Sequence, residues 1–183
     1  LSKGELPLAA KHFQQTLKLA PTFASAWQNL GEALQAPGER EAAREAFQQA
    51  MQFQPDLLEA HQQLGILEKE MGHLDAAMEQ LQRANQIAPD DAKTHYHLGE
   101  VYHQKKQFEL AMTEYHTAIR LKPDTVLAYL RLAEVYENKG NRQTALTFYQ
   151  RFIGMAGPHP ELHQQRQAAE AKQKEIDGKG VVR

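Results

Sequence analysis

The chain has 183 residues, of which 42% are apolar and 24% charged, and its formal net charge is −2. Because its charges nearly cancel, nothing draws the chain as a whole toward nucleic acid or an acidic membrane surface, and no run of residues approaches the ~20 apolar positions of a membrane-spanning helix. It has no cysteine, which excludes disulfides, cysteine-based zinc sites and thiol nucleophiles.

Four prolines recur at a constant interval. An interval of 34 residues separates each proline from the next in the series Pro21, Pro55, Pro89 and Pro123. A fixed period of this length is typical of repeat proteins whose unit is a helix–turn–helix. Such units contact only their neighbours and present a long surface, so the pattern favours binding over catalysis.

The chain begins within a unit of this repeat. The positions that mark the second half of the later units recur at residues 4–21. We therefore expect residues 1–23 to form the second helix of a truncated N-terminal repeat, which indicates a piece of a longer protein. Leu6, Phe13 and Leu17 would lie on an open apolar face, and exposed apolar surface of this kind favours self-association.

Four complete units follow in register: 24–57, 58–91, 92–125 and 126–159. In each unit, apolar residues three and four apart define one face of a first helix and then of a second. Gly31 and Ala43 would let the two helix backbones approach, while Trp27 and Phe47 fill the space between them. Proline ends the second helix, although in the fourth unit it is displaced by one position, to Pro158.

Glycine separates the two helices of most units. Pro37-Gly38, Gly72 and Gly140 stand between first and second helices, and glycine there can adopt the left-handed conformation that closes a helix. The third unit has Lys106 at this place. Its turn must therefore close with some strain or with a different geometry.

Beyond the fourth unit, prolines interrupt the chain, and residues 160–183 are expected to form a capping helix and tail. Leu162, Ala169 and Ile176 recur every seven positions among polar residues. This pattern is typical of a helix that covers the last repeat and faces water on its other side. From Asp177 onward the chain is expected to fray.

With these marks the sequence resembles the tetratricopeptide repeat (TPR) family. The resemblance rests on segments such as Ala26-Trp27-Gln28-Asn29-Leu30-Gly31 and Ala84-Asn85-Gln86-Ile87-Ala88-Pro89, and it covers roughly residues 4–157. Four isolated positions depart from the family pattern: Glu68, Lys106, Ala133 and Phe152. The resemblance implies an all-α fold, a right-handed superhelical solenoid of helix–turn–helix repeats with a C-terminal capping helix.

The resemblance also implies a binding groove, lined by the second, fifth, sixth, ninth, twelfth and thirteenth residues of each unit. In the first two units these are Ser25, Gln28, Asn29, Glu32, Gln35, Ala36, Glu59, Gln62, Gln63, Ile66, Lys69 and Glu70. In the last two they are Lys93, Tyr96, His97, Glu100, His103, Gln104, Leu127, Leu130, Arg131, Glu134, Glu137 and Asn138. From them we select the candidate partner-binding residues Gln28, Asn29, Gln62, Gln63, Ile66, Lys93, Tyr96, His97, Glu100, Leu127, Leu130 and Arg131.

The chemistry of these candidates suits an extended peptide. The four amide side chains carry both donors and acceptors, which can pair with a peptide backbone. Tyr96, Leu127 and Leu130 would form an apolar anchor patch flanked by Ile66. A contact elsewhere, such as the convex face, is the alternative.

Two known TPR binding modes fit only in part. One class grips a C-terminal carboxylate with a clamp of lysine, asparagine and arginine; of the matching positions only Lys93 fits, and Glu32 would repel a carboxylate. A second class holds peptide backbone with a ladder of asparagines. That ladder begins at Asn29 and does not continue, because the next units have Gln63 and His97.

No metal site, cofactor or catalytic site is expected. Nine histidines are present, but His97 and His103 are six positions apart on one helix, which turns them to different faces, and a metal needs converging ligands. The sequence contains no glycine-rich phosphate loop and no Gly-x-Ser-x-Gly turn. We do not expect an enzyme.

The sequence therefore predicts a scaffold that binds a protein or peptide in a concave groove. The rival interpretation is a substrate-recognition or assembly arm of a larger enzyme or secretion complex, and a third is a lattice-forming scaffold. We expect no nucleic-acid partner and no membrane insertion, and a homo-oligomer through the open N-terminal end is a further hypothesis. A soluble protein is expected, while cytoplasm and periplasm fit the sequence equally well.

Overall fold

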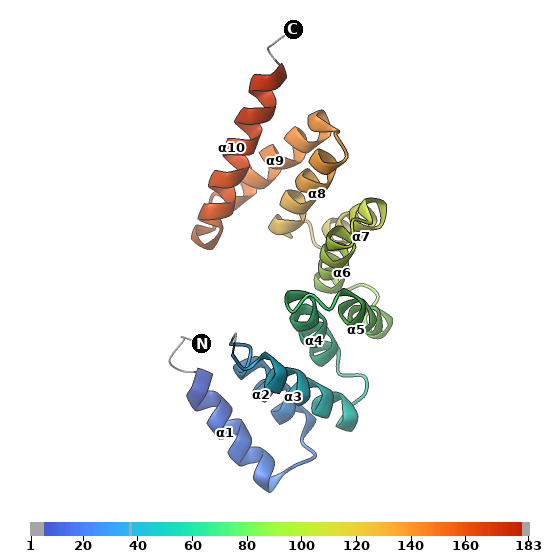
Figure 1. The fold of residues 1–183 in the computed structure, drawn as a ribbon, viewed down its shortest axis with the longest axis vertical. Coiled ribbons are helices and arrows are strands. Elements are labelled where there is room, and N and C mark those ends of the chain that lie inside the picture. The colour runs from blue at the N-terminus through green and yellow to red at the C-terminus, as the bar shows by residue number, and fades with distance from the viewer. Residues whose placement is uncertain (1–5, 37, 181–183) are drawn as a thin grey trace. The chain divides into compact units, whose positions relative to one another are not determined.

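A computed structural model describes residues 6–36 and 38–180. These residues form ten α-helices and one short 3₁₀ helix and contain no strand, so the predicted all-α repeat fold is confirmed. Parts of the expected N-terminal unit, first turn and tail (residues 1–5, Pro37 and 181–183) lie outside the described residues. The helices in chain order are α1 (Leu6–Leu19), α2 (Ala24–Ala33), α3 (Arg40–Phe53), α4 (Leu58–Glu70), α5 (Leu74–Ile87), α6 (Ala92–Gln104), α7 (Phe108–Leu121), α8 (Val126–Asn138), α9 (Arg142–Ala156), η1 (Pro160–Leu162) and α10 (His163–Gly180) (Figure 1).

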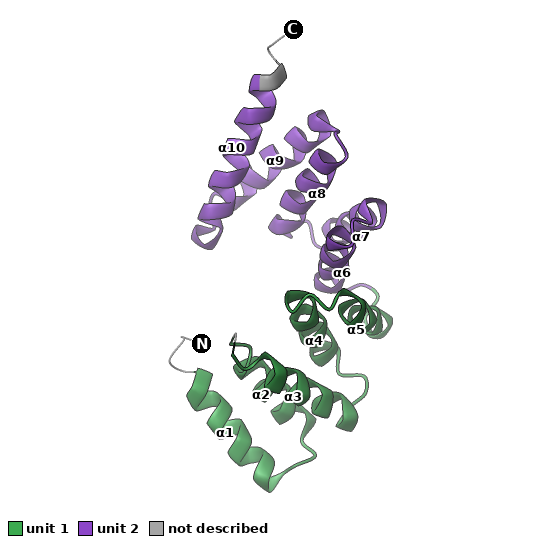
Figure 2. Cartoon of the chain, in the orientation of Figure 1, with its two compact units in different colours: residues 1–89 green, residues 90–183 purple. Residues whose placement is uncertain are grey.

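The chain divides into two compact units, residues 1–89 and 90–183 (Figure 2). Unit 1 contains α1 and the helical hairpins α2–α3 and α4–α5. Unit 2 contains the hairpins α6–α7 and α8–α9, followed by η1 and α10. The division falls at a repeat proline, Pro89, so each unit holds two hairpins of the repeat.

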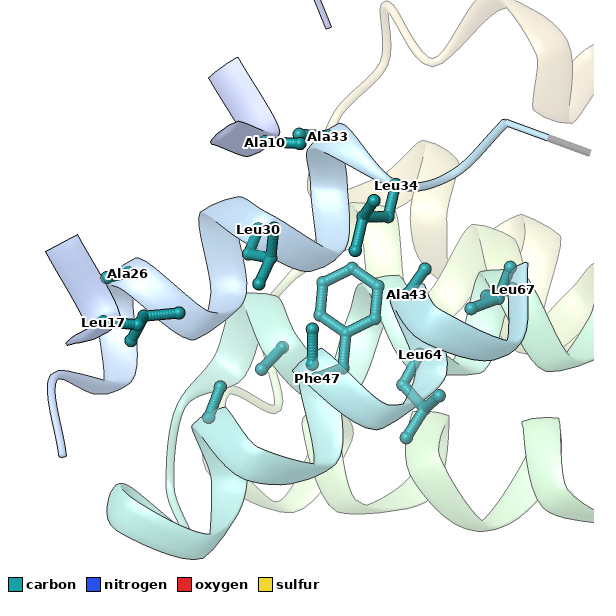
Figure 3. Close-up of a cluster of buried hydrophobic side chains, with 13 residues drawn as sticks. Ala10, Leu17, Ala26, Leu30, Ala33, Leu34, Ala43, Phe47, Leu64 and Leu67 are labelled. Carbon is teal, nitrogen blue, oxygen red and sulfur yellow. The ribbon is translucent and has the colours of Figure 1, made fainter. Parts of the chain in front are cut away.

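The core of unit 1 forms around Phe47, whose side chain is completely buried. Leu30 from α2, Leu34 at the C-terminal cap of α2, Ala43 from α3 and Leu64 from α4 belong to the same cluster (Figure 3). Small side chains let the helices approach, and the phenylalanine ring fills the remaining space. The small and large residues that recur in the sequence therefore pack against one another between consecutive helices.

The core of unit 2 is more aromatic. Tyr115, Tyr149 and Phe152 are the largest of its completely or nearly completely buried side chains. Tyr136 and Phe148 stack with ring centroids 5.4 Å apart, which is a favourable offset for aromatic pairs. Tyrosine hydroxyls thereby enter the interior of this unit, where each one needs a partner.

A polar contact ties the start of three units to the preceding proline. Trp27 Nε1 donates to the Pro21 carbonyl at 2.7 Å, and Tyr129 donates its hydroxyl to the Pro123 carbonyl at 3.0 Å. The second unit places His61 at this position, and its Nε2 lies 2.9 Å from the carbonyl oxygen of the proline six residues earlier. The position therefore favours a large ring that carries an N–H or O–H group.

The turns inside the hairpins α4–α5, α6–α7 and α8–α9 share one left-handed geometry. Gly72 and Gly140 have φ values of 84° and 76°, and Lys106 has φ 59°. The Lys106 amide donates to the His103 carbonyl at 2.9 Å, as the Gly140 amide does to that of Glu137. Of the two alternatives left open at Lys106, the different geometry is wrong, and the turn is closed with strain.

Replacing Lys106 with glycine is expected to stabilise unit 2 by about 0.5–1 kcal/mol. A side chain in the left-handed region costs about 1–2 kcal/mol, which exceeds the ~0.4–1 kcal/mol lost because glycine frees the unfolded chain. Urea unfolding followed by circular dichroism measures the change. The reverse substitution, Gly140→Lys, serves as its counterpart and should lower the unfolding free energy by about 1 kcal/mol; a less stable Lys106→Gly protein would contradict the strain.

The C-terminal segment differs from the prediction at its end. Leu162, Ala169 and Ile176 are buried and join the core of the last hairpin, so the capping role of α10 is confirmed. The sequence predicts fraying from Asp177, but α10 continues to Gly180, and residues 181–183 of the expected tail lie outside the described residues. Ile176, which is buried in the core, lies in the helical turn that precedes the last residues of α10.

The expected open face of α1 is also corrected. Leu17 is buried in the core of unit 1, because it faces α2. Among the described residues at this end, the large exposed apolar side chains are Leu8, Leu19 and Phe23, and Leu19 is 90% exposed. Self-association through this end stays a prediction, with these residues in place of Leu17.

Candidate functional site

The predicted groove positions of unit 1 line a cavity of about 430 Å³. Its polar lining residues are Asn29 and Glu32 from α2, Gln35 just after α2, and Gln63 from α4, while α1 contributes Leu6 and Phe13. The Gln35 side-chain amide donates to Gln63 Oε1 at 3.3 Å. Each of these two amides keeps further donors or acceptors for a ligand.

Unit 2 has two neighbouring cavities on the first helices of its hairpins. The first, here called the central cavity, has a volume of about 300 Å³. It is lined by Glu100, His103, Gln104, Tyr115, Arg131 and Glu134. The second, called the terminal cavity, has about 480 Å³ and shares His103, Arg131 and Glu134 with the first. The remaining residues of the terminal cavity are Leu130, Glu137, Asn138, Tyr149, Gln165, Ala168, Ala169 and Lys172.

Arg131 joins the two cavities through a network of charges. Its Nη2 lies 3.2 Å from Glu100 Oε1, and its Nη1 donates to Glu134 Oε2 at 3.0 Å. Glu100 also accepts the Tyr96 hydroxyl at 3.1 Å and contacts His97 Nδ1 at 3.1 Å. Burial by itself would lower the pKa of the Arg131 guanidinium, but interactions with Tyr96, Glu134 and Glu100 raise it overall. The guanidinium is therefore held charged in a half-buried site.

Glu137 connects two other lining residues of the terminal cavity by hydrogen bonds. It accepts the Tyr149 hydroxyl at 2.7 Å and the Lys172 ammonium of α10 at 2.9 Å. Burial opposes its ionisation, but the hydrogen bonds from Lys172 and Tyr149 lower the pKa of the Glu137 carboxyl overall. The capping helix thus contributes a charged side chain to the cavity as well as covering the core.

His103 lies where the two cavities meet. Its Nε2 is 3.1 Å from Asn138 Nδ2, so the ring nitrogen accepts and the amide donates. Burial lowers the pKa of the His103 imidazole. At neutral pH the ring therefore adds no positive charge to the site.

A third cavity of unit 2, of about 480 Å³, lies between the start of α6, the start of α8 and η1. Lys93, Tyr96 and Leu127 line it together with Val126 and Leu162. Its lining is mainly apolar. Three of the predicted residues therefore meet here, and one of them, Tyr96, also belongs to the charge network through Glu100.

The predicted partner-binding residues separate into groups. Most of them line one of the cavities of their own unit: Asn29, Gln63, Lys93, Tyr96, Glu100, Leu127, Leu130 and Arg131. Gln28, Gln62, Ile66 and His97 line none of these cavities. Gln28 instead bonds to Glu32 at 3.0 Å.

Burial separates the expected anchor patch from the surface. Tyr96 is 8% and Leu130 6% exposed, because both pack on the second helices of their hairpins. Each forms the base of a cavity, while Leu127 is half-buried. The patch therefore offers little of the aromatic surface that an anchor uses.

The prediction from first-helix positions missed side chains of the other helices. Tyr115 of α7, Tyr149 of α9 and Lys172 of α10 all line the cavities. The two tyrosines stand 34 residues apart at a position where the first repeat has Phe47. The hydroxyl, which a purely apolar packing position does not need, was the signal that could have identified them.

Two further observations concern the part of the chain that the structure describes. Within it, no three histidine, aspartate or glutamate side chains are arranged to hold a metal ion. None of its helices combines the length and the apolar character needed to cross a membrane.

Comparisons with known families agree along most of the chain. Models described as TPR repeat match residues 67–106 and 99–140. Models described as tetratricopeptide repeat match residues 127–154 and residues 1–57. No curated protein sequence matches the chain.

Solved structures resemble most of the chain. A crystal structure of MamA is 25% identical, with a TM-score of 0.77, and covers 87% of this chain and 94% of its own. MamA from Desulfovibrio magneticus RS-1 is 19% identical, with a TM-score of 0.78 and coverage of 86% and 89%. YrrB, described as a TPR protein with an unusual peptide-binding site, is 20% identical, with a TM-score of 0.71 and coverage of 91% and 86%.

Proposed function

Because the chain belongs to the tetratricopeptide repeat family, we propose that it is a protein-interaction scaffold that binds a partner segment along the first helices of its repeats. One observation carries this proposal. In both units, cavities open on the groove positions, with Asn29 and Gln63 in unit 1 and Glu100 and Arg131 in unit 2. YrrB, which is described as a TPR protein with an unusual peptide-binding site, supports the same function.

The two units offer different chemistry to a partner. In unit 1, Gln35 and Gln63 bond to each other through one donor and one acceptor, so the remaining amide groups can pair with a peptide backbone. In unit 2 the cavities carry charged groups held in place by one another. Side chains that are already fixed lose little conformational entropy when a partner binds.

The test uses an array of random-sequence peptides and compares three variants with the parent protein. One groove variant carries Asn29→Ala and Gln63→Ala in unit 1, and a second carries Gln104→Ala in unit 2. The control carries Gln48→Ala and Arg120→Ala, which are exposed on the second helices α3 and α7. For peptides that the parent protein selects, we expect the groove variants to lose about tenfold in affinity, which corresponds to about 1.4 kcal/mol.

The control variant should bind these peptides with the affinity of the parent protein. If the control loses binding and the groove variants keep it, the convex face is the binding surface and the proposal is wrong. If no peptide is selected at all, binding of an extended segment is also wrong. Circular dichroism of each variant shows whether its fold is intact.

A further inference from the structure

The most unusual group in the central cavity is a buried hydroxyl that lacks a partner. The side chain of Tyr115 is completely buried, and its hydroxyl makes no hydrogen bond within the described part of the chain. A buried polar group in this state costs about 1–3 kcal/mol. Such a group needs an explanation, and one explanation is a ligand.

The neighbouring hairpin shows what is missing. Tyr149, one repeat later, donates its hydroxyl to Glu137 at 2.7 Å. The residue that matches Glu137 in the third repeat is His103, and its ring bonds to Asn138 instead. Tyr115 therefore lacks the internal acceptor that Tyr149 has in the next hairpin.

Tyr115 belongs to the lining of the central cavity, together with Glu100, Arg131 and Glu134. Burial is the main cause that raises the pKa of the Tyr115 phenol, and Glu100, Tyr96 and Glu134 raise it further. Arg131 alone acts in the opposite direction. The surroundings of the oxygen are therefore negative on balance, which favours a donor or a cation.

Glu134 supplies a carboxylate oxygen that is still open. Its Oε2 accepts from Arg131 Nη1, and no other hydrogen bond to Glu134 is formed within residues 6–36 and 38–180. Glu100, by contrast, is engaged by Tyr96, His97 and Arg131. One half-used carboxylate and one unused phenol oxygen thus line the same cavity.

The charges of the two adjoining cavities leave an excess of carboxylate. Glu100, Glu134 and Glu137 face the cations Arg131 and Lys172. Burial lowers the pKa of the His103 imidazole, so His103 does not offset this excess near neutral pH. A carboxylate ligand would meet repulsion here, whereas a cationic side chain would complete the charge balance.

We propose that the central cavity of unit 2 binds an arginine side chain of the partner segment, with its guanidinium on the free oxygen of Glu134 and the hydroxyl oxygen of Tyr115. Arginine fits better than lysine, because its planar group has five N–H donors and can serve both oxygens and the Gln104 side chain at once. The proposal rests on the proposed function and adds to it the chemistry of the partner.

The probes are blocked decapeptides in which alanine alternates with arginine, lysine, citrulline or glutamate. Citrulline has nearly the shape of arginine and no charge. Calorimetry on the full chain at low and at physiological salt should show the arginine peptide binding about tenfold more tightly than the citrulline peptide, since hydrogen bonds to charged groups contribute about 1.5–3 kcal/mol. Equal affinity for the two peptides overturns the proposal.

Three variants separate the site from general electrostatics. Tyr115→Phe should weaken the arginine peptide about fivefold, the equivalent of about 1 kcal/mol for one hydrogen bond, and leave the thermal midpoint unchanged or higher, because an unpartnered buried group is removed. Glu134→Gln should weaken it about tenfold. Glu170→Gln, which makes the same charge change beside Arg166 on α10, should leave the affinity unchanged.

The remaining outcomes are decisive as well. Unchanged binding by Tyr115→Phe, or equal losses for Glu134→Gln and Glu170→Gln, overturns the arginine site. If the citrulline or glutamate peptide binds best and the unit 2 groove variant Gln104→Ala abolishes it, the arginine site is wrong and the proposed function stands. If none of the peptides binds, the arginine site is wrong, and the random-peptide array decides on the proposed function separately.

Discussion

Gly99→Ala is expected to lower the free energy of unfolding of unit 2 by about 2–3 kcal/mol. A Cβ atom at Gly99 would lie 2.6 Å from the Cδ1 and Cε1 atoms of the Tyr115 ring. That ring is completely buried, so it cannot turn away into solvent. Helices α6 and α7 would have to separate, and overpacking of this kind costs about 1–3 kcal/mol. Urea unfolding monitored by circular dichroism measures the loss.

Gly154→Ala is the matched control, with the opposite sign. Gly154 lies in α9, and a Cβ atom there would meet nothing within 4 Å. Alanine is favoured over glycine inside a helix by about 0.5–1 kcal/mol, so this variant should be more stable than the parent protein. If both substitutions change stability in the same direction, close packing is not the reason for the glycine at position 99.

The fourth hairpin accommodates a methyl group at the position that matches Gly99. Ala133 occupies the position of Gly99 one repeat later, and it is completely buried near Tyr149. The expected loss at Gly99 therefore comes from refitting an existing contact. It does not come from a rule that the position accepts only glycine.

The fold could be predicted because the same packing pattern recurs in every repeat of the sequence. Small residues such as Gly31 and Ala43 oppose large ones such as Phe47 in each unit, and the same contacts appear in the core. A periodic signal of this kind depends on nearest neighbours alone. It survives isolated departures such as Lys106, where a strained conformation keeps the turn geometry.

The candidate site could be predicted only in part, because the pattern of first-helix positions does not report depth. Tyr96 and Leu130 match groove positions, yet the second helices cover most of their surface. The hydroxyl of Tyr115 has no partner among the described residues, and His103, which stands at the matching acceptor position, is hydrogen-bonded to Asn138 of the next hairpin instead. Pairings across hairpins are set by side-chain conformations, which a repeat pattern leaves open.

The junction between α3 and α4 carries an ion pair where the matching junction of unit 2 is apolar. Arg44 Nε lies 3.1 Å from Glu68 Oε1, and Glu68 Oε2 lies 2.8 Å from His73 Nδ1. Glu68 is only 5% exposed. The equivalent positions of unit 2 hold Met112 and Tyr136, both of which pack against its core.

Arg44→Met is expected to destabilise unit 1 by about 2–3 kcal/mol. Removing one partner of a buried ion pair costs about 3–5 kcal/mol, because the other charge is left uncompensated. The loss should be smaller here, since Arg44 is partly exposed and His73 still contacts Glu68. Thermal and urea unfolding should agree on this loss.

Adding Glu68→Tyr to Arg44→Met should restore stability to within about 1 kcal/mol of the parent protein or above it. The double variant transfers the apolar pair of the α7–α8 junction into unit 1, and apolar replacements of buried ion pairs are often neutral or stabilising. The cycle formed with Glu68→Tyr alone gives the coupling between the two positions. If the double variant is less stable than Arg44→Met, the ion pair stabilises this junction more than apolar packing could, and the equivalence of the two junctions fails.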